Sequence, residues 1–383
     1  MASGKESTSK LHHTRLNVVS EQHGSALASV RHGRKKTNEL GAARFVVYSS
    51  TFFWGAPFVA TDFKCRMCGS GDARREITVR EMMFGTRTVF QYVECSGCEG
   101  LQIDSIPDNL SEFYPDNYYS FSTRDGSITA RARIGIFLRQ LQRRAHRAGY
   151  DSFQKLLALR LGPIFIPKVL EKLEIPSTAR ILDVGCGAGS LLIELRDAGF
   201  VHPQGVDPFL PRSISYPGGV RVARASLSEM RGPFDLIMLH HVFEHLPDPL
   251  QTLRECRDLL STDGQLLLRF PSVPCEAFDV YGTDWLALDA PRHLHIVSRV
   301  GLESMGHAAG LKITSWSQDS EAQQFWGSEQ YLRDIPLFDK RSFTKDRSVL
   351  DPVRLREMEM KAEALNRAGR GDWSVAVLQI ANP

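Results

Sequence analysis

Apolar residues recur with two different spacings along the second half of the chain. The short apolar run 181–184 suits a strand that is buried on both faces. After three glycines, Leu191, Leu195 and Ala198 share one helical face, and Gly199 follows as a C-cap candidate. A strand, a glycine turn and a helix form the first unit of an α/β sheet that binds nucleotides, because glycines let the backbone approach a ligand.

The same alternation continues to the end of the chain and predicts the α/β fold class. Small and apolar residues lead to Asp207 at the end of a second strand, and residues 220–226 contain a third. Later segments fit the same pattern. Strands are expected over residues 236–239, 265–270, 311–316 and 374–380, helices over 250–260 and 300–310, and a charged helical insertion over 320–368.

The first part of the chain follows a different pattern. Residues 76–83 and 86–93 predict two strands around a turn at Gly85. Residues 128–160 predict a basic helix with one apolar stripe. Its section 131–147 suits docking on a neighbouring element better than peripheral contact with an anionic membrane, which stays open as an alternative.

Polar and aromatic segments flank these elements. Residues 1–44 are rich in Ser, His, Lys and Arg with no sustained period, which predicts a disordered arm. The basic run 31–36 suits a solvated tail better than a nucleic acid contact. Residues 101–122 are rich in Tyr and Phe. They are expected to pack the two strands predicted over 76–93 onto a neighbour, or to line a substrate site.

Composition and charge change this picture little. The 383 residues allow two or three domains with a sizeable core, and the formal net charge is +3. Residues 1–175 hold 25 Lys and Arg against 17 Asp and Glu, whereas the rest holds 22 against 27. This asymmetry suits solvated surface charge better than an anionic partner near the front. No apolar run reaches the roughly 18–20 residues of a membrane span, so no transmembrane segment is expected.

Four of the seven cysteines form two C-x-x-C pairs, Cys65 with Cys68 and Cys95 with Cys98. Two such pairs supply four thiolates to one tetrahedral zinc ion, and the strands between them complete a zinc ribbon. Four protein ligands leave no open position, so this zinc is expected to be structural. An odd number of cysteines without a signal peptide favours a reducing, cytoplasmic location over a disulfide framework.

Candidate chemistry gathers where the predicted strands end. The turn over residues 183–189 has the spacing Asp-x-Gly-x-Gly-x-Gly, and Ser190 stands where a dinucleotide motif requires Gly or Ala. Asp207, at the end of the second strand, can accept hydrogen bonds from both hydroxyls of a ribose. The pattern therefore indicates a site for a nucleoside ligand.

Three segments, Arg180–Phe200, Gly205–Asp207 and Phe234–Pro249, resemble successive motifs of the class I S-adenosylmethionine (SAM)-dependent methyltransferases. The family's usual Pro-Gly-Gly before the fifth strand is Ser-Thr-Asp-Gly here, a loop departure that leaves the cofactor site intact. A zinc ribbon in front of this domain is similar to bacterial small-molecule methyltransferases, including sugar C-methyltransferases. The resemblance implies a Rossmann-like sheet of seven strands in the order 3-2-1-4-5-7-6.

The resemblance also implies where SAM binds. The expected cofactor residues are Asp183, Gly185, Cys186, Gly187 and Gly189 at the methionine end, Asp207 at the ribose, Ser226 and Leu227 at the adenine, and His240 along the cofactor. The Asn/Asp-Pro-Pro-Tyr signature of many nucleic acid amino-methyltransferases is absent after the fourth strand, which argues against that class.

Methyl transfer to a hydroxyl or a carbon acid needs a general base, and histidine suits neutral pH. The candidates are His241 and His245, in the turn after the fourth strand, and His293, in a polar cluster after the fifth. Asp289 and Arg292 can orient His293 or bind an anionic substrate. A purely structural role is the alternative for each of the three histidines.

Together these patterns predict four regions and one principal function. The regions are a disordered basic arm (1–44), a zinc ribbon with an aromatic segment (45–122), a basic helical connector (123–175) and a SAM-dependent methyltransferase domain (176–383). The expected reaction is methyl transfer to a small molecule, such as a sugar, a glycoconjugate or a natural product. The alternatives are an rRNA or tRNA methyltransferase whose ribbon binds RNA, and a non-catalytic binding module.

Overall fold

The structure, a computed structural model, describes residues 63–114, 134–135, 137–138, 141–142, 170, 173 and 175–381. The predicted arm over 1–44, with its basic run 31–36, lies outside the described residues. So do most of the connector predicted for 123–175, including the larger part of 131–147, and the end of the aromatic segment at 115–122. The predicted domain boundaries therefore stay predictions.

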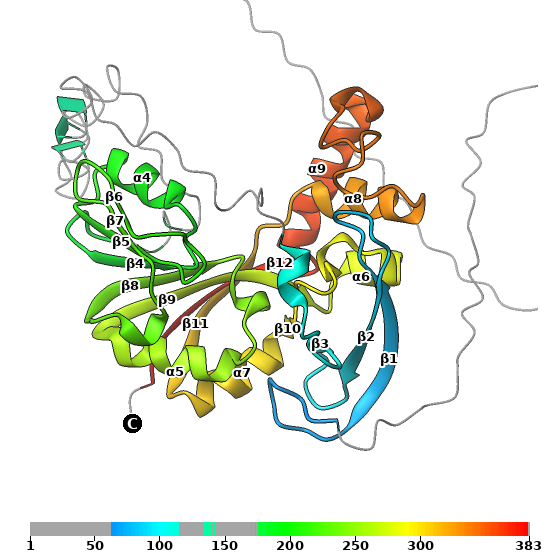
Figure 1. Cartoon of the computed structure of the whole chain (residues 1–383), viewed down its shortest axis with the longest axis horizontal. Helices are drawn as coiled ribbons and strands as arrows, with labels where there is room; N and C mark the ends of the chain where they lie inside the picture. The colour runs from blue at the N-terminus through cyan, green and yellow to red at the C-terminus, as the bar shows by residue number, and fades with distance from the viewer. Residues whose placement is uncertain are drawn as a thin grey trace, which may run out of the picture. The chain divides into compact units, whose positions relative to one another are not determined.

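A mixed sheet forms the centre of the described chain (Figure 1). Its core strands are β4 (Arg180–Val184), β5 (His202–Val206), β7 (Arg221–Ala223), β8 (Phe234–His240), β9 (Leu260–Val273), β11 (Leu311–Gln318) and β12 (Trp373–Ile380). They lie in the order β7-β5-β4-β8-β9-β12-β11, and β12 is antiparallel to both of its neighbours. Numbered along the chain, this order is 3-2-1-4-5-7-6, so the predicted fold class is confirmed. A short β6 (Ile214–Ser215) pairs with β7 at the edge.

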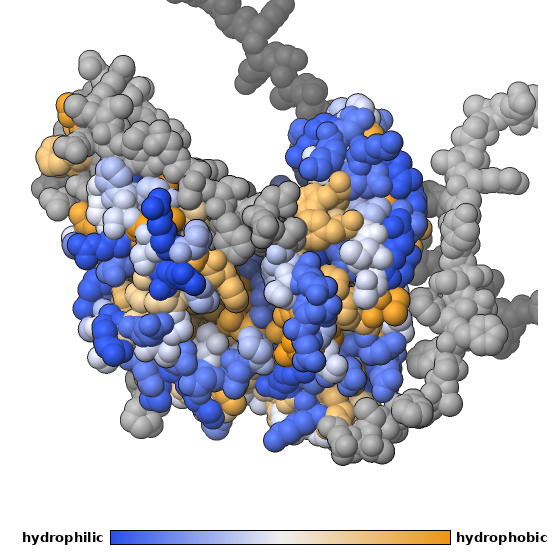
Figure 2. All heavy atoms as spheres, viewed as in Figure 1, coloured by the Kyte–Doolittle hydropathy of each residue, from blue (hydrophilic) through white to orange (hydrophobic). Residues whose placement is uncertain are grey.

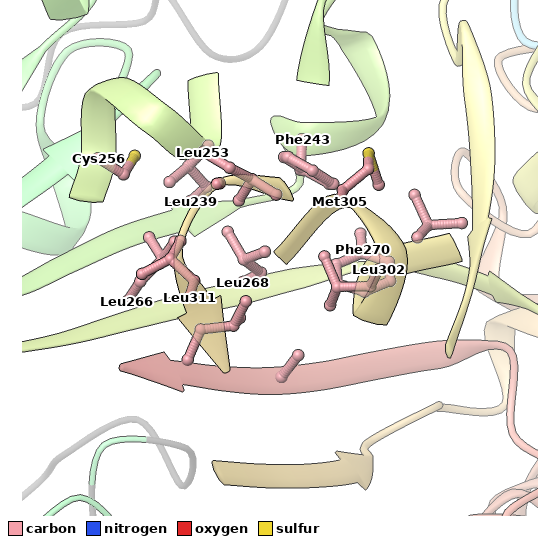
Figure 3. Packing of buried hydrophobic residues seen from close by; sticks show 14 of the residues in the cluster. Leu239, Phe243, Leu253, Cys256, Leu266, Leu268, Phe270, Leu302, Met305 and Leu311 are labelled. Carbon is pink, nitrogen blue, oxygen red and sulfur yellow. The ribbon is translucent and has the colours of Figure 1, made fainter. Parts of the chain in front are cut away.

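Helices cover both faces of the sheet because its central strands are apolar on both sides. Leu268 of β9 packs in one cluster with α5 (Pro249–Leu259) and α7 (Arg299–Ala308), which Figure 3 shows at close range. The neighbouring Leu267 packs in a second cluster with α4 (Ser190–Asp197). β9 therefore packs against a helical layer on each of its two faces. Each fully buried leucine stabilises the fold by about 1.5–3 kcal/mol relative to an exposed one.

Side-chain caps fix where the two helices on that first face begin. Asp248 accepts a hydrogen bond from the backbone N–H of Gln251 at 2.9 Å, and Pro249 occupies the first helical position of α5. Ser298 accepts from the N–H of Gly301 at 2.9 Å and starts α7. Each cap is worth about 0.5–2 kcal/mol, and each one starts a helix directly after a segment that belongs to the candidate site.

The ribbon strands continue the same sheet. They are β1 (Ala73–Arg80), β2 (Val89–Cys95) and β3 (Leu101–Ile103), followed by a short η1 (Leu110–Phe113). β3 pairs antiparallel with β10 (His295–Ser298), and β10 in turn pairs parallel with the end of β9. The sequence pattern predicted neither β3 nor β10, because strands of three and four residues are too short to show a period.

The turn of the ribbon hairpin is longer than the sequence pattern predicts, because Glu81 organises it. Its carboxylate accepts hydrogen bonds from the backbone N–H groups of Phe84 and Thr86, both at 2.9 Å. The chain therefore leaves β1 before residue 81 and enters β2 at Val89, instead of extending over 76–83 and 86–93.

The predicted insertion after β11 is helical. It holds α8 (Gln323–Leu332), a short η7 (Arg347–Val349) and α9 (Pro352–Arg367). Figure 2 shows a largely hydrophilic outer surface on α9. Buried hydrophobic residues of α8 and α9, among them Phe325 and Met358, pack together in one cluster. The remaining short elements are η3 (Leu227–Glu229), η4 (Phe243–His245), α6 (Glu276–Tyr281), η5 (Gly282–Asp284) and η6 (Leu286–Leu288). No helix in the described part is both long and apolar enough to cross a bilayer.

Candidate functional site

The glycine turn lies at the carboxyl ends of the parallel strands, directly after β4. Gly185, Gly187 and Gly189 have φ values of +68°, +52° and +81°, a region that residues with a Cβ rarely adopt. A Cβ at Gly185 would also lie 2.6 Å from Cγ2 of Val242, in the turn after β8. The glycines therefore let two loops approach each other at the edge where open α/β sheets bind ligands.

Two carboxylates flank this turn. Asp207, directly after β5, accepts hydrogen bonds from the N–H of Gly187 and of Phe209, both at 2.9 Å. Asp183 is buried in β4. Burial, together with the charge of Asp207, raises the pKa of Asp183 to about 8. None of the described ion pairs involves Asp183, so the pair is an uncompensated acidic site that suits a cationic ligand.

The other expected cofactor residues surround the same edge. Ser226 and Leu227 follow β7, where Ser226 forms a capping box with Glu229. The half-buried Cys186 lies in the glycine turn, and burial raises the pKa of its thiol. His240 ends β8, and burial lowers its pKa to about 3, so the ring is neutral near pH 7. Its Nε2 has no hydrogen-bond partner among the described residues.

A cleft of about 850 Å³ extends from this edge toward the helical insertion. Leu191 and His240 line it beside the glycine turn, and Arg269 of β9 lines it further along. Aromatic side chains, Trp326 and Phe343, form part of the opposite wall. Asp183, Asp207 and the turn glycines are not among the residues that line this cleft, whose wall mixes aromatic and hydrogen-bonding groups.

The three candidate bases differ in their surroundings. His241 has a φ of +55°, and its Nε2 contacts the guanidinium of Arg269, which also pairs with Asp319 at 2.6 Å. Nδ1 of His241 lies 3.7 Å from Glu244. The two ring nitrogens of His241 therefore face a guanidinium and a carboxylate.

His245 and His293 lie together on the other side of Glu244. Their ring centroids are 4.8 Å apart. Nδ1 of His245 lies 2.8 Å from the carbonyl of Arg292, and Nδ1 of His293 lies 2.7 Å from that of Ala287. A carbonyl only accepts, so each Nδ1 carries the proton and each Nε2 keeps a lone pair. Burial lowers the pKa of His293 to about 4 and keeps it neutral near pH 7.

Residues of the ribbon contact the segment that carries His293. The hydroxyl of buried Tyr92, on β2, donates to the carbonyl of His293 at 2.7 Å. Glu81 binds the buried Arg292 at 2.9 Å, and Arg292 also pairs with Asp289 at 2.6 Å. The neighbours Asp289 and Arg292 thus form a buried ion network rather than an open anion site. The sequence analysis did not identify Glu81, Tyr92 or Glu244, and the only local signal was the carboxylate next to His245.

The four ribbon cysteines converge as the spacing predicts. Their Sγ atoms all lie within 4.8 Å of one another, with Cys65 and Cys98 at 3.6 Å and Cys68 and Cys95 at 3.5 Å. Tetrahedral zinc with Zn–S bonds of about 2.3 Å places its sulfurs about 3.8 Å apart. The cluster therefore has the size of a structural zinc site, and all four thiols remain available as ligands.

Comparisons with known proteins agree with this geometry. A family described as "Methyltransferase domain" matches residues 137–316. A ubiquinone biosynthesis O-methyltransferase from Xanthomonas axonopodis pv. citri is 33% identical over 147 residues, which cover 35% of this chain and 61% of that protein. The protein of the same name from Xanthomonas euvesicatoria pv. vesicatoria is 32% identical over 147 residues, with the same coverage of both chains. The chain thus spans less than two thirds of the length of these relatives.

Among solved structures, the cyclopropane synthase MmaA2 from Mycobacterium tuberculosis is similar over 55% of this chain and 81% of that one. Its sequence identity is 16% and its TM-score is 0.36. The family match and the strand order together confirm the methyltransferase domain predicted from the glycine turn and the motifs that follow it.

Proposed function

We propose that this chain, which contains a class I SAM-dependent methyltransferase domain, transfers a methyl group from SAM to a hydroxyl group of a small molecule. The observation that carries the proposal is the buried pair Asp183 and Asp207, which no described cation pairs with, on either side of a glycine turn at the carboxyl ends of the parallel strands. A sulfonium nucleoside with an ammonium group supplies the positive charge that this pair lacks.

The chain's own groups would hold the cofactor in two places. Asp183 would pair with the ammonium of the methionine end, beside Gly185, Cys186, Gly187 and Gly189. Asp207 would accept from the ribose hydroxyls with the lone pairs that its two backbone hydrogen bonds leave free. Ser226 and Leu227 would lie at the adenine and His240 along the cofactor.

SAM held there would supply a methyl group on a good leaving group, for an acceptor oxygen that gives up its proton. The protein must then align the acceptor, exclude water and help remove the acceptor's proton. The cleft provides the first two, because its walls come from the sheet edge and from the insertion. Glu244, His245 and His293 do not line this cleft themselves. They are linked to it through His241, which lies beside Glu244 and contacts Arg269 of the cleft wall, and they are the proposed site of acceptor activation.

The acceptor class is inferred from the cleft walls and from the relatives. Trp326 and Phe343 suit the flat face of a ring, while Arg269, Arg347 and Asn366 offer hydrogen bonds to hydroxyl or phosphate groups. The relatives are named as O-methyltransferases of ubiquinone biosynthesis. A hydroxylated ring compound, such as a sugar or a glycoconjugate, fits this combination.

Methyl transfer from isotopically labelled SAM to panels of nucleotide sugars, hydroxylated aromatics and RNA tests the proposal. We expect label in a small molecule that carries a hydroxyl, and loss of that label in an Asp183→Asn variant. Label in RNA, with binding that weakens steeply as salt rises, would instead support the RNA methyltransferase alternative. No transfer to any panel, with intact SAM binding, would support a non-catalytic module.

The four cysteines of the ribbon have a separate proposed role. We propose that Cys65, Cys68, Cys95 and Cys98 hold one zinc ion that stabilises the ribbon and takes no part in the reaction. The size of the sulfur cluster supports this role, as does the absence of a fifth candidate ligand beside it among the described residues.

A further inference from the structure

A buried carboxylate without a cationic partner lies in the turn after β8. Glu244 is fully buried, and neither carboxylate oxygen accepts a hydrogen bond from a described residue. Within the described part of the chain its ion-pair partners are imidazoles, those of His241 at 3.7 Å and His293 at 3.9 Å. Burying an ionised carboxylate costs several kcal/mol unless a partner compensates it.

The nearby arginines do not supply that partner. Arg292 is bound by two other carboxylates, Asp289 at 2.6 Å and Glu81 at 2.9 Å. Arg269 pairs with Asp319 at 2.6 Å and contacts His241. Among the described residues, therefore, no arginine or lysine compensates the charge of Glu244.

The two histidines beside Glu244 are oriented as metal ligands usually are. The Nδ1–H groups of His245 and His293 donate to backbone carbonyls, which fixes both rings and leaves each Nε2 with a lone pair. One nitrogen of each ring and one oxygen of Glu244 lie within 4.8 Å of one another. His245 is half-buried, so the group has one side open to solvent.

We propose that Glu244, His245 and His293 bind a divalent cation of the zinc, cobalt or iron(II) type, at a second site separate from the four cysteines. Two imidazoles and one carboxylate form a ligand set for such cations that leaves coordination positions open. Ligands about 2.1 Å from a tetrahedral ion lie about 3.4 Å apart, so the three side chains close by roughly an ångström on binding.

The consequence for catalysis rests on the proposed function. A divalent cation lowers the pKa of a hydroxyl that it binds, so this site would help deprotonate the acceptor near neutral pH. Val242, between His241 and Glu244, contacts the glycine turn closely enough to exclude a Cβ at Gly185. The cation site therefore belongs to a loop that touches the proposed cofactor site.

Titration with Co²⁺, followed by visible absorption and calorimetry, tests the proposal on the zinc-loaded full-length protein, meaning protein that a mild chelator has brought to one zinc per chain, held by the four cysteines. We expect one Co²⁺ per chain, with an absorption spectrum that lacks thiolate charge-transfer bands because the new ligands are nitrogen and oxygen. Glu244→Gln and His293→Ala should each weaken Co²⁺ binding at least about tenfold. His307→Ala, which changes an exposed histidine on α7, is the matched control and should bind as the parent does.

Two results would overturn the site. One is no uptake of Co²⁺ by the zinc-loaded parent, and the other is equal affinity in Glu244→Gln and in the His307→Ala control. S-adenosylhomocysteine (SAH) binding, measured on the same samples, separates the two proposals. Protein that binds SAH but not Co²⁺ contradicts only the cation site, whereas protein that binds Co²⁺ but not SAH contradicts only the proposed function.

Discussion

At the scale of single residues, the glycine turn and its two carboxylates carry the cofactor proposal. Asp183 and Asp207 come from adjacent parallel strands, β4 and β5, and so reach the same edge of the sheet. Their identities and spacing could be predicted from the sequence, because a strand end, a glycine turn and an acid follow each other locally. Their shared burial and charge depend on the folded arrangement.

The first prediction concerns the proton on Asp183. Burial raises its pKa to about 8, with a smaller contribution from Asp207, so this carboxyl is mostly protonated near pH 7 in the free protein. The ammonium of bound SAM favours the ionised form. Binding near pH 7 should therefore release a proton, and affinity should rise from about pH 6 to about pH 8 and then level off.

Calorimetric titration in two buffers with different ionisation enthalpies measures that proton. The apparent binding enthalpy should differ between the buffers for the parent protein and not for Asp183→Asn. Equal enthalpies for the parent in both buffers would contradict the placement of the ammonium at Asp183.

The second prediction separates backbone strain from steric contact. Gly185→Ala combines a φ of +68° with a Cβ 2.6 Å from the stiff side chain of Val242. Gly310→Ala has a similar φ of +72° and no atom within 4 Å of the new Cβ. The control should lose about 1–2 kcal/mol of unfolding free energy from strain alone, and Gly185→Ala should lose more and also lose SAH binding.

Urea unfolding and SAH titration of both variants test this comparison. If the two variants lost the same stability and kept the same SAH affinity, the close approach of the two loops would not matter for binding.

At the scale of elements, the ribbon strands support the candidate site across long sequence distances. Tyr92 on β2 and the carbonyl of His293 are 201 residues apart in the chain. Glu81 and Arg292 are 211 residues apart. The sequence could not predict these contacts, or the pairing of β3 with β10, because they arise only when two separately patterned segments meet. Core strands such as β4, β8 and β9 were predictable because each one shows its own apolar run.

The third prediction compares two variants, each of which loses the hydroxyl group of one tyrosine. Tyr92 donates to the carbonyl of His293, whereas Tyr216 donates to the carbonyl of Ala188 in the glycine turn at 2.8 Å. Each Tyr→Phe change leaves one carbonyl without its donor, at a cost of about 1–3 kcal/mol where it is buried. Tyr92→Phe should weaken acceptor use, measured as kcat/KM, and Tyr216→Phe should weaken SAH binding.

Steady-state kinetics and SAH titration of both variants distinguish the two effects. The ribbon would have no positioning role if Tyr92→Phe changed neither kcat/KM for the acceptor nor its pH profile while the protein stayed folded.

At the scale of the whole described chain, the cysteine cluster and the catalytic sheet form one structure. Ser298, which caps α7, also donates its hydroxyl hydrogen to the carbonyl of Cys98. β10, which ends at that serine, joins β3 to β9. Disturbing the proposed zinc site should therefore affect the residues just before β10, including His293.

The fourth prediction follows from that continuity. Cys98→Ser should lose bound zinc and lower the unfolding temperature by several degrees, because metal binding contributes to folding free energy. Ser96→Ala, an exposed position in the same knuckle, is the matched control and should keep both properties. Metal analysis and thermal unfolding of the two variants measure the difference, and a Cys98→Ser protein that kept its zinc would contradict the four-cysteine site.

The binding of SAH to the full-length protein, measured by calorimetry, most directly tests whether the β4–β5 edge is a cofactor site. We expect one SAH per chain, with at least about tenfold weaker binding to Asp207→Ala and parent-like binding to Asp258→Ala, an exposed aspartate on α5. Absence of SAH binding to the parent, or equal affinity in the two aspartate variants, would contradict the cofactor site at these strand ends.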